Sequence, residues 1–288
     1  MAVFYETIPQ TLIEWILKQK LLWVATAPLS GAGHVNVSPK GGSYFGVIDE
    51  KTFWYMDLTG SGSETIAHLH EPGNGRITVM FNAFEGAPKI VRLWGHGKVL
   101  ENGTKPFEEF IAEHNVKTIP GSRSIIIVDI HQVGSSCGFS VPFYDFKEFR
   151  PTLNDHFAKL DAKHKASGEV KDSMDHYWAY KNAWSVDGMP SMKRGQVMLK
   201  KHHVTPLKKM VGPMAPTHYQ SGFGVPLSRV IMAVLLAFFL GLAVAVYAPV
   251  LITTLGYPIG TAPSGLKTLN STRASFEDVA GLLWGNSK

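Results

Sequence analysis

The feature that most constrains this 288-residue chain is an apolar segment near its C-terminal end. Residues 230–252 (VIMAVLLAFFLGLAVAVYAPVLI) contain no charged or amide side chain, and Tyr247 carries the only hydroxyl group. A helix rising about 1.5 Å per residue extends about 35 Å over this length, enough to cross a hydrocarbon core of about 30 Å. A buried helix of a soluble core is the alternative, but such helices seldom stay apolar on every face. We therefore predict a single transmembrane helix over 230–252.

The sequence before this segment is strongly basic. Between Gly188 and Arg229 there are seven lysine or arginine residues and no aspartate or glutamate, and the next basic residues after the segment are Lys267 and Arg273. Positive charges beside a span favour the cytosolic side. We therefore predict a single-pass membrane protein whose N-terminal part faces the cytosol. The basic stretch is alternatively a solvated linker, and attraction to anionic lipid headgroups would be an additional role.

The composition argues against several other classes of protein. The net charge of +5 is concentrated in that late stretch, and no basic helix interleaved with aromatic residues occurs in the first half, so we predict no nucleic-acid binding. Cys137 is the only cysteine, which excludes an intrachain disulfide and suits a reducing compartment. The twelve histidines show no spacing typical of metal ligands, so we predict no metal site.

Short segments rich in β-branched and aromatic residues dominate the first half of the chain. Separated by Gly, Pro, Asn and Asp, they are typical of β-strands joined by turns. The predicted strands are 21–27, 34–39, 44–48, 52–58, 76–81, 90–100 and 124–133, and the predicted short helices are 11–19, 61–69 and 105–114. Ser61 and Glu64 have the spacing of a capping box at the second helix. This pattern favours a closed or half-closed antiparallel β-barrel over a βαβ sheet.

We divide the chain into four regions. Residues 140–225 contain aromatic residues, Pro, Gly and scattered Lys without a clear period, which predicts an irregular extension packed on the barrel. The predicted regions are a barrel domain (1–150), an irregular extension with a basic juxtamembrane linker (151–229), a transmembrane helix (230–252) and a C-terminal tail (253–288).

Three stretches, taken together, resemble a known family. They are VATAPLSGAGHVNVSPKG (24–41), DLTGSGSETIAHL (57–69) and NGRITVMFNAFEGAPKIVRLWGHGKV (74–99). In this order and spacing they resemble the pyridoxamine 5'-phosphate oxidase-like family of FMN-binding split-barrel proteins, in particular a branch of small soluble proteins. The likeness continues through SCGFSVPFYDF (136–146) and KNAWSVDGMP (181–190), so it covers the greater part of the chain.

The resemblance implies a mainly β (α+β) domain: a six-stranded antiparallel split β-barrel with short helices, which forms a homodimer and holds FMN at the subunit interface. In such proteins, basic and hydroxyl side chains of a barrel strand and of the loop entering a short helix bind the flavin phosphate. The matching positions here are Ser38 and Lys40 at a strand end, and Thr59, Gly60, Ser61, Ser63 and Thr65 around the helix start, with Arg92 as a further candidate on strand 90–100.

The chemistry of these residues suits a phosphate. Glycines allow the backbone to approach the ligand, hydroxyl and helix N–H groups bind anions, and Lys40 supplies a compensating charge. An ordinary structural role is the alternative: Ser61 then only caps the helix, Lys40 is a solvated turn residue, and Arg92 pairs with a carboxylate. The resemblance favours the phosphate site.

Two departures from the family pattern affect the predicted activity. The soluble oxidases carry a basic pair at the helix entry, where this chain has Ser63 and Glu64. They also carry a C-terminal arginine and histidine that recognise the substrate, and here the linker and the apolar segment replace them. We therefore do not expect oxidation of vitamin B6 itself, and we expect flavin binding with a weaker phosphate contact.

Three hypotheses for function remain open. The first is an FMN-dependent oxidoreductase acting on an unknown small substrate, in which the protein positions the flavin and the flavin performs the redox chemistry. No residue stands out as its general acid or base, so no catalytic residue is predicted. The second is a membrane-tethered module without turnover, such as a flavin-binding sensor or an assembly partner. The third is a barrel that holds haem or a deazaflavin, which a visible spectrum of the 1–225 fragment would distinguish.

Overall fold

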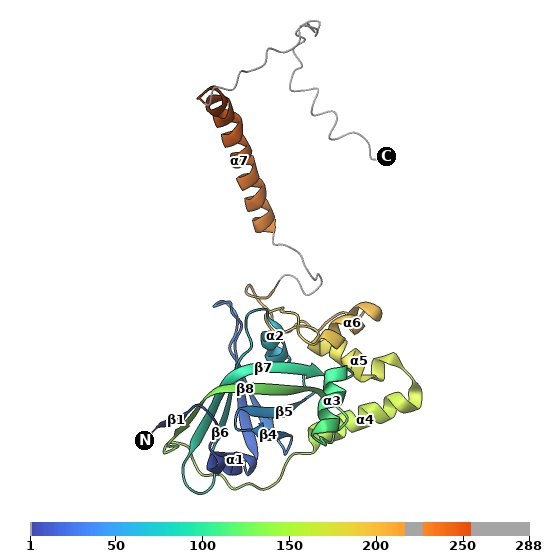
Figure 1. Ribbon diagram of the computed structural model, residues 1–288. Coiled ribbons are helices and arrows are strands. Elements are labelled where there is room, and N and C mark those ends of the chain that lie inside the picture. The colour runs from blue at the N-terminus through green and yellow to red at the C-terminus, as the bar shows by residue number, and fades with distance from the viewer. Residues whose placement is uncertain (1, 217–226, 255–288) are drawn as a thin grey trace. The chain divides into compact units, whose positions relative to one another are not determined.

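The computed structural model describes residues 2–216 and 227–254 (Figure 1). The chain divides into two compact units, Met1–Gly222 and Phe223–Lys288. The predicted tail beyond residue 254 lies outside the described residues, and so does part of the predicted linker. The two units are therefore considered one at a time.

The first unit is built on one antiparallel sheet. Its strands are β1 (Val3–Tyr5), β2 (Leu21–Thr26), β3 (Asn36–Gly41), β4 (Phe45–Asp49), β5 (Thr52–Leu58), β6 (Arg76–Asn82), β7 (Ile90–Glu101) and β8 (Ser122–Ser136). The order across the sheet is β3-β2-β6-β7-β8-β5-β4, and β1 pairs with β8. The strong curl of β7 and β8 in Figure 1 wraps this sheet around its core.

The prediction of six strands is too low, because the sheet has eight. All seven predicted strand segments are present, and the unpredicted one is β1, whose three residues are too few to show an alternating pattern. Within the described residues, β3 and β4 end the strand order and no ladder joins them, so the barrel is open. This geometry fits a split barrel.

The interior of the curled sheet is the main hydrophobic core. The residues of β2 alternate between partly exposed and buried, as expected for a strand that has one face in the core. Phe53, Phe81 and Leu93 from three different strands are fully buried there. Helix α1 (Gln10–Leu17) adds Leu12 and Ile16 to the same core.

Two more short helices accompany the sheet. Helix α2 (Glu64–His70) follows β5 and contacts β2 and β7. Helix α3 (Lys105–Glu113) places Phe107 and Phe110 in a second apolar cluster with Met56 and Ile125. The predicted capping box is wrong: Ser63, not Ser61, is the N-cap of α2, and no side chain caps that helix end.

The region predicted to be an irregular extension contains several helices. They are α4 (Thr152–Ser167), the short 3-10 turn η1 (Val170–Asp172), α5 (Met174–Tyr177), the π-helical turn η2 (Trp178–Asn182) and α6 (Lys193–Lys201). Helix α4 has Phe157 as its only fully buried residue, so its sequence lacks the apolar stripe from which a helix is predicted.

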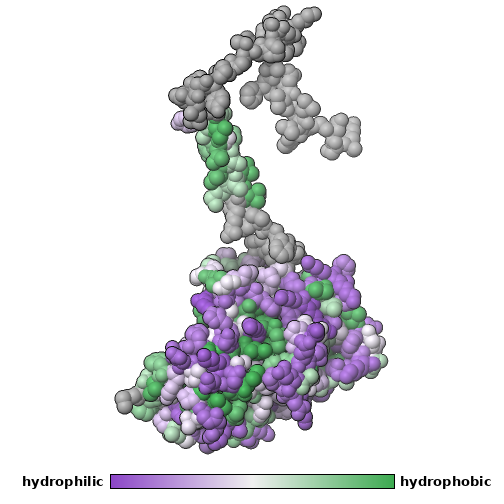
Figure 2. All heavy atoms as spheres, in the orientation of Figure 1, coloured by the Kyte–Doolittle hydropathy of each residue, from purple (hydrophilic) through white to green (hydrophobic). Residues whose placement is uncertain are grey.

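The second unit contains helix α7 (Leu227–Thr254), which includes all of the predicted span. Figure 2 shows hydrophobic side chains on its surface, and the window Val230–Tyr247 has a mean hydropathy of 2.8 with none of its surface buried. Among the described residues it is the one helix that is long and apolar enough to cross a membrane.

Candidate functional site

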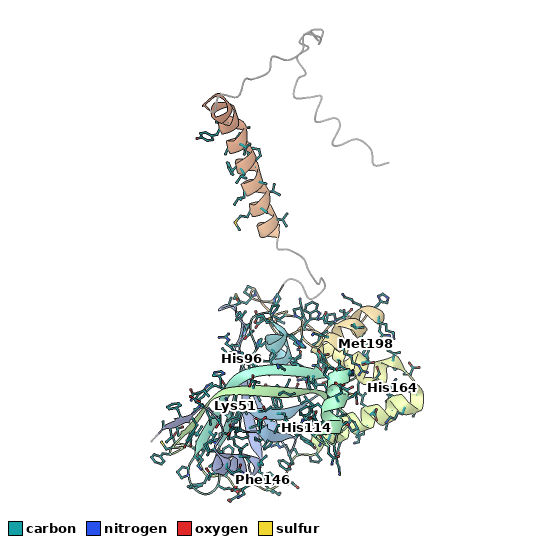
Figure 3. All side chains as sticks on the ribbon, viewed as in Figure 1. Lys51, His96, His114, Phe146, His164 and Met198 are labelled. Carbon is teal, nitrogen blue, oxygen red and sulfur yellow. The ribbon has the colours of Figure 1, made fainter. Side chains whose placement is uncertain are left out.

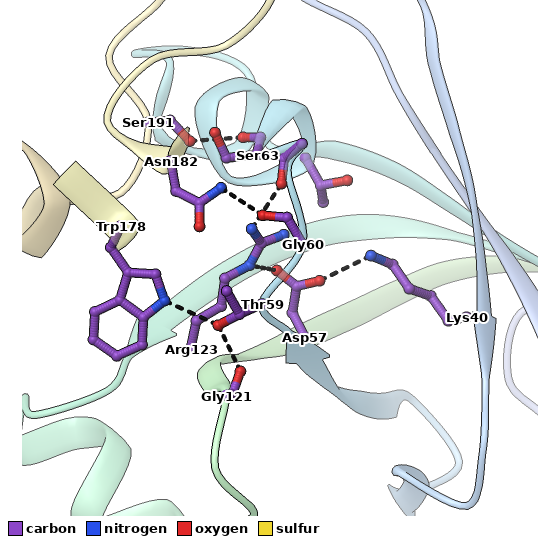
Figure 4. Close-up of polar contacts among 12 residues, drawn as sticks. Lys40, Asp57, Thr59, Gly60, Ser63, Gly121, Arg123, Trp178, Asn182 and Ser191 are labelled. Carbon is purple, nitrogen blue, oxygen red and sulfur yellow. Dashed lines mark hydrogen bonds and ion pairs between the residues drawn. The ribbon is translucent and has the colours of Figure 1, made fainter. Parts of the chain in front are cut away.

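The candidate site surrounds the loop between β5 and α2, residues 59–63. This loop follows Asp57, which lies near the end of an otherwise apolar strand. Figure 4 shows the loop between the ion cluster around Asp57 on one side and the chain segment after α5 on the other. The site therefore joins parts of the sequence that are far apart.

A buried carboxylate linked to two cations lies at one edge of the site. Asp57 is completely buried, and its two oxygens accept from Lys40 Nζ at 2.8 Å and from Arg123 Nε at 2.7 Å. Burial by itself raises the pKa of the Asp57 carboxyl, but Arg123 and Lys40 outweigh it and lower this pKa to about 2. Asp57 is therefore ionised at neutral pH, and the three side chains together carry one net positive charge.

Backbone carbonyl groups of the loop are held by donors from elsewhere in the fold. Asn182 Nδ2 donates to the carbonyl oxygen of Gly60 at 2.8 Å and, at 3.5 Å, to that of Ser61. The carbonyl oxygen of Gly62 accepts from Arg123 Nη1 at 2.7 Å, and that of Ser63 accepts from Ser191 Oγ at 2.6 Å. Every carbonyl from residue 60 to residue 63 thus has a partner.

The backbone N–H groups of this loop, unlike its carbonyl groups, lack hydrogen-bond partners among the described residues. Within residues 2–216 and 227–254, no acceptor is found for the backbone N–H groups of residues 60–64. A methyl group added at Gly60 would meet no atom within 4 Å, so space is open beside that residue. Because the carbonyl groups of this loop are hydrogen-bonded and its N–H groups are not, the loop presents hydrogen-bond donors to an anion.

Two of the predicted hydroxyl groups, those of Thr59 and Ser63, are engaged within the protein. Thr59 Oγ1 donates to the carbonyl oxygen of Gly121 at 2.7 Å and accepts from Trp178 Nε1 at 2.9 Å. Ser63 Oγ donates to the carbonyl oxygen of Trp184 at 3.3 Å. Both hydroxyl side chains are buried, so they hold the loop in shape.

The remaining predicted residues fall into two groups. Ser38 and Lys40 pair with Val24 and Leu22, so all four side chains lie on the inner face of the sheet. Thr65 is buried near them and accepts from Asn36 Nδ2 at 3.0 Å, while Ser61 is exposed. The Ser38 hydroxyl donates to Asn36 Oδ1 at 3.2 Å, so Ser38 is linked to α2 through Asn36, while Lys40 is linked to the start of the loop through Asp57.

Arg92 lies elsewhere. Arg92 in β7 pairs with Met80 in β6, and Met80 in turn pairs with Trp23 in β2. Trp23 alternates with the inward-facing Leu22 and Val24, so this row is on the outer face of the sheet. The structure thus brings seven of the eight predicted residues together and leaves Arg92 outside the group.

A third cation approaches the site from the segment after α6. Lys209 Nζ lies 3.4 Å from Ser63 Oγ and 3.5 Å from Glu64 Oε1, and 10% of its side chain is exposed. Burial lowers the pKa of this lysine, although Glu64 opposes the shift. Glu64 also accepts from the backbone N–H of Val186 at 3.1 Å.

Two uncharged polar side chains are buried in the barrel interior beside the site. Burial raises the pKa of Tyr55 well above its ordinary value, and burial lowers the pKa of His68. His68 Nδ1 shares a hydrogen bond with Thr26 Oγ1 at 2.9 Å, while Tyr55 Oη and His68 Nε2 have no partner in the described structure. Both groups are neutral at pH 7.

Several residues of the site were not predicted from the sequence. Asp57 carried a weak signal, because it is a charged residue in an otherwise apolar strand, whereas Arg123 lies between two serines before the apolar run and carried none. Asn182, Trp178 and Lys209 carried none, since they act on the loop from more than 100 positions away. Local patterns cannot detect contacts of that kind.

The described residues contain no group of three or more His, Cys, Asp or Glu side chains that could hold a metal ion. Figure 3 illustrates the reason, since His96, His114 and His164 lie on separate elements of the fold. Imidazole groups so far apart cannot share one ion.

The family model described as pyridoxamine 5'-phosphate oxidase matches residues 8–137. The pyridoxamine 5'-phosphate oxidase family protein ustO of Aspergillus flavus is 39% identical over 202 residues, which cover 67% of this chain and 78% of that protein.

Two solved structures were also compared. A structure described as a putative pyridoxamine 5'-phosphate oxidase from Lactobacillus delbrueckii is 20% identical, covers 45% of this chain and 94% of its own, and has a TM-score of 0.34. The FAD binding protein from Mycobacterium smegmatis is 11% identical, covers 46% of this chain and 97% of its own, and has a TM-score of 0.31. At these scores neither structure adds to the evidence from the sequence relative.

Proposed function

Because this chain belongs to the pyridoxamine 5'-phosphate oxidase family, we propose that it binds FMN and is a membrane-anchored, flavin-dependent oxidoreductase of a small substrate. The observation that carries the flavin proposal concerns the loop before α2: the carbonyl groups of residues 60–63 accept hydrogen bonds, while no acceptor is found among the described residues for the N–H groups of residues 60–64. The flavin phosphate is the anion that this loop would bind.

The charges around the loop support this assignment. Lys40 and Arg123 share one carboxylate, Asp57, so the cluster keeps one positive charge that a phosphate would neutralise. Hydrogen bonds between charged partners are about twice as strong as neutral ones. We assign phosphate contacts to Lys40, the exposed Ser61 hydroxyl and the free N–H groups, and we assign Thr59, Ser63 and Thr65 to shaping the loop.

Bound FMN would supply the redox chemistry, and the protein would orient it. Strand β3, which carries Ser38 and Lys40, ends the strand order and exposes Val37, while the adjacent Val35 is also exposed. An apolar sheet edge of this kind is normally covered by another surface. We propose that a second copy of the chain covers it, so that the flavin lies between two subunits.

A visible spectrum of the purified full chain tests the proposal most directly. FMN binding gives a flavin spectrum after FMN is added and free ligand is removed, whereas haem binding gives a Soret band. Sedimentation of the same sample reports whether the protein is a dimer. A colourless protein after incubation with FMN would refute the flavin proposal.

Removal of the Lys40 charge tests the phosphate assignment. We expect Lys40→Met to weaken FMN binding by about 1–3 kcal/mol, or roughly 5-fold to 150-fold, because one charge-assisted contact is lost. Titration of FMN with fluorescence detection measures this change. Lys98→Met removes an exposed lysine from β7 and serves as the control. Equal dissociation constants for both variants would remove Lys40 from the site.

The second prediction concerns the substrate. We expect the FMN-loaded protein not to oxidise pyridoxamine 5'-phosphate at a useful rate, because the family's substrate-recognising arginine and histidine have no counterpart in this chain. Release of hydrogen peroxide after addition of that compound is the assay. Turnover of about 1 per second or faster, which is in the ordinary range for enzymes, would contradict the prediction.

A further inference from the structure

Lys209 is an unusual residue because its charge is buried and weakly paired. Its side chain is 10% exposed, and its two polar contacts, to Ser63 and Glu64, are 3.4 and 3.5 Å long. An ammonium group removed from water requires close partners to offset the loss of hydration. The present contacts are at the outer limit of hydrogen bonding. Among the described residues, Lys209 Nζ therefore has no close anionic partner.

The position of Lys209 indicates which anion it would meet. Ser63 and Glu64, its two partners, belong to the group of residues whose N–H groups are free. The charge of Arg123 further lowers the pKa of Lys209, so these two cations are close enough to repel each other. One anion placed beside the loop would relieve that repulsion.

We propose that Lys209 is a ligand of the phosphate group of the flavin. This inference rests on the proposed function and adds to it a residue that lies outside the region matched by the family model, residues 8–137. Lys209 would supply, from a distant part of the chain, the positive charge that the helix entry lacks at Ser63 and Glu64. On binding the phosphate, Lys209 Nζ exchanges its long contact with Glu64 for a close one.

A consequence follows for the basic segment around Lys209. This residue precedes Leu227, the first residue of α7, by 18 positions. Phosphate binding would therefore fasten the stretch that leads towards the apolar helix onto the barrel. Flavin occupancy and the accessibility of this stretch are then coupled.

FMN and riboflavin, which differ by the phosphate, provide the main test on the full chain in detergent. We expect Lys209→Gln to weaken FMN binding about 10-fold to 100-fold and to leave riboflavin binding unchanged. Lys208→Gln is the matched control, because Lys208 is the exposed neighbour and the charge change is the same. The urea midpoint of each variant shows whether it is folded.

Glu64→Gln provides a test of opposite sign. It removes the carboxylate that competes for Lys209, while the amide oxygen of glutamine can still accept from Val186 N–H. We expect FMN binding to tighten roughly 3-fold to 10-fold, again without effect on riboflavin. This variant keeps the proposal testable if Lys209→Gln fails to fold. Inorganic phosphate should compete with FMN in the wild type and compete less well in Lys209→Gln.

Trypsin provides a readout that is independent of affinity. We expect FMN, but not riboflavin, to slow cleavage after Lys208 and Lys209 relative to cleavage after Lys200 and Lys201. If the wild type binds no FMN, the proposed function itself fails. If the wild type binds FMN but Lys209→Gln and Lys208→Gln bind it equally, only the role of Lys209 is overturned. Unchanged binding in Glu64→Gln would also count against it.

Discussion

Replacing Asp57 by asparagine is expected to lower the free energy of unfolding by about 3–5 kcal/mol, because two cations then lose their shared carboxylate. Asp57 is fully buried and Arg123 is 3% exposed, so water cannot solvate the guanidinium in place of the lost carboxylate charge. Asparagine has nearly the same shape, so the change tests charge more than packing. Urea unfolding of wild type and variant measures the difference.

The dependence of the free energy of unfolding on pH, measured in the acid range, provides a second test of the Asp57 carboxyl. The pKa of Asp57 is about 2 in the folded protein, below its value of about 3.9 in an unfolded chain. A carboxyl with a lowered folded pKa contributes stability that is complete above about pH 4 and is lost as the pH falls towards 2. Asp57→Asn should lack this part of the acid-induced loss.

The control for both measurements is Asp145→Asn. Asp145 is exposed, and its replacement removes the same charge from the surface of the protein. Surface changes of this kind usually alter stability by less than about 0.5 kcal/mol. If Asp57→Asn is no more destabilising than Asp145→Asn, the buried ion cluster does not hold the site together.

The second large effect concerns α7. We propose that α7 spans a membrane, and we expect the full chain to stay in the membrane pellet in alkaline carbonate, while a chain ending at residue 216 is released. Two lysines at Leu236 and Leu240 should release the full chain as well, because each charge at a helix centre costs about 2.5–3.5 kcal/mol. Both leucine side chains are exposed, so the substitutions disturb no packing among the described residues.

Leu236→Ile with Leu240→Ile is the apolar control for this experiment and should remain in the pellet. Release of the unaltered full chain by carbonate would mean that α7 is not embedded in the membrane. Orientation is tested separately in sealed microsomes. The basic residues before α7 favour a cytosolic barrel. Protease should therefore digest the barrel and spare a C-terminal tag, and the opposite pattern would reverse the topology.

Features that depend on local pattern could be predicted without the structure. Alternation of apolar and polar residues identified the strands from 21 to 133, since one buried face imposes a period of two. The apolar run at 230–252 identified α7, because the length and hydropathy of a helix are properties of its own sequence and do not depend on contacts with distant segments. The collinear motifs pointed to the family that the relative at 39% identity establishes. The same motifs drew attention to residues 59–65, whose role in binding phosphate stays a prediction.

The contacts that hold the loop at residues 59–63, and the charges around it, became visible only in the folded chain. The ion cluster joins Asp57 to Arg123 across 66 positions, and Asn182 reaches Gly60 across 122. The sequence presented Lys40 as a lone cation, whereas the fold gives it a buried carboxylate partner. It also presented Thr59 and Ser63 as free hydroxyls, although both are bonded within the protein. Such pairings depend on which distant segments the folded chain brings into contact, and short-range periodicity contains no information about them.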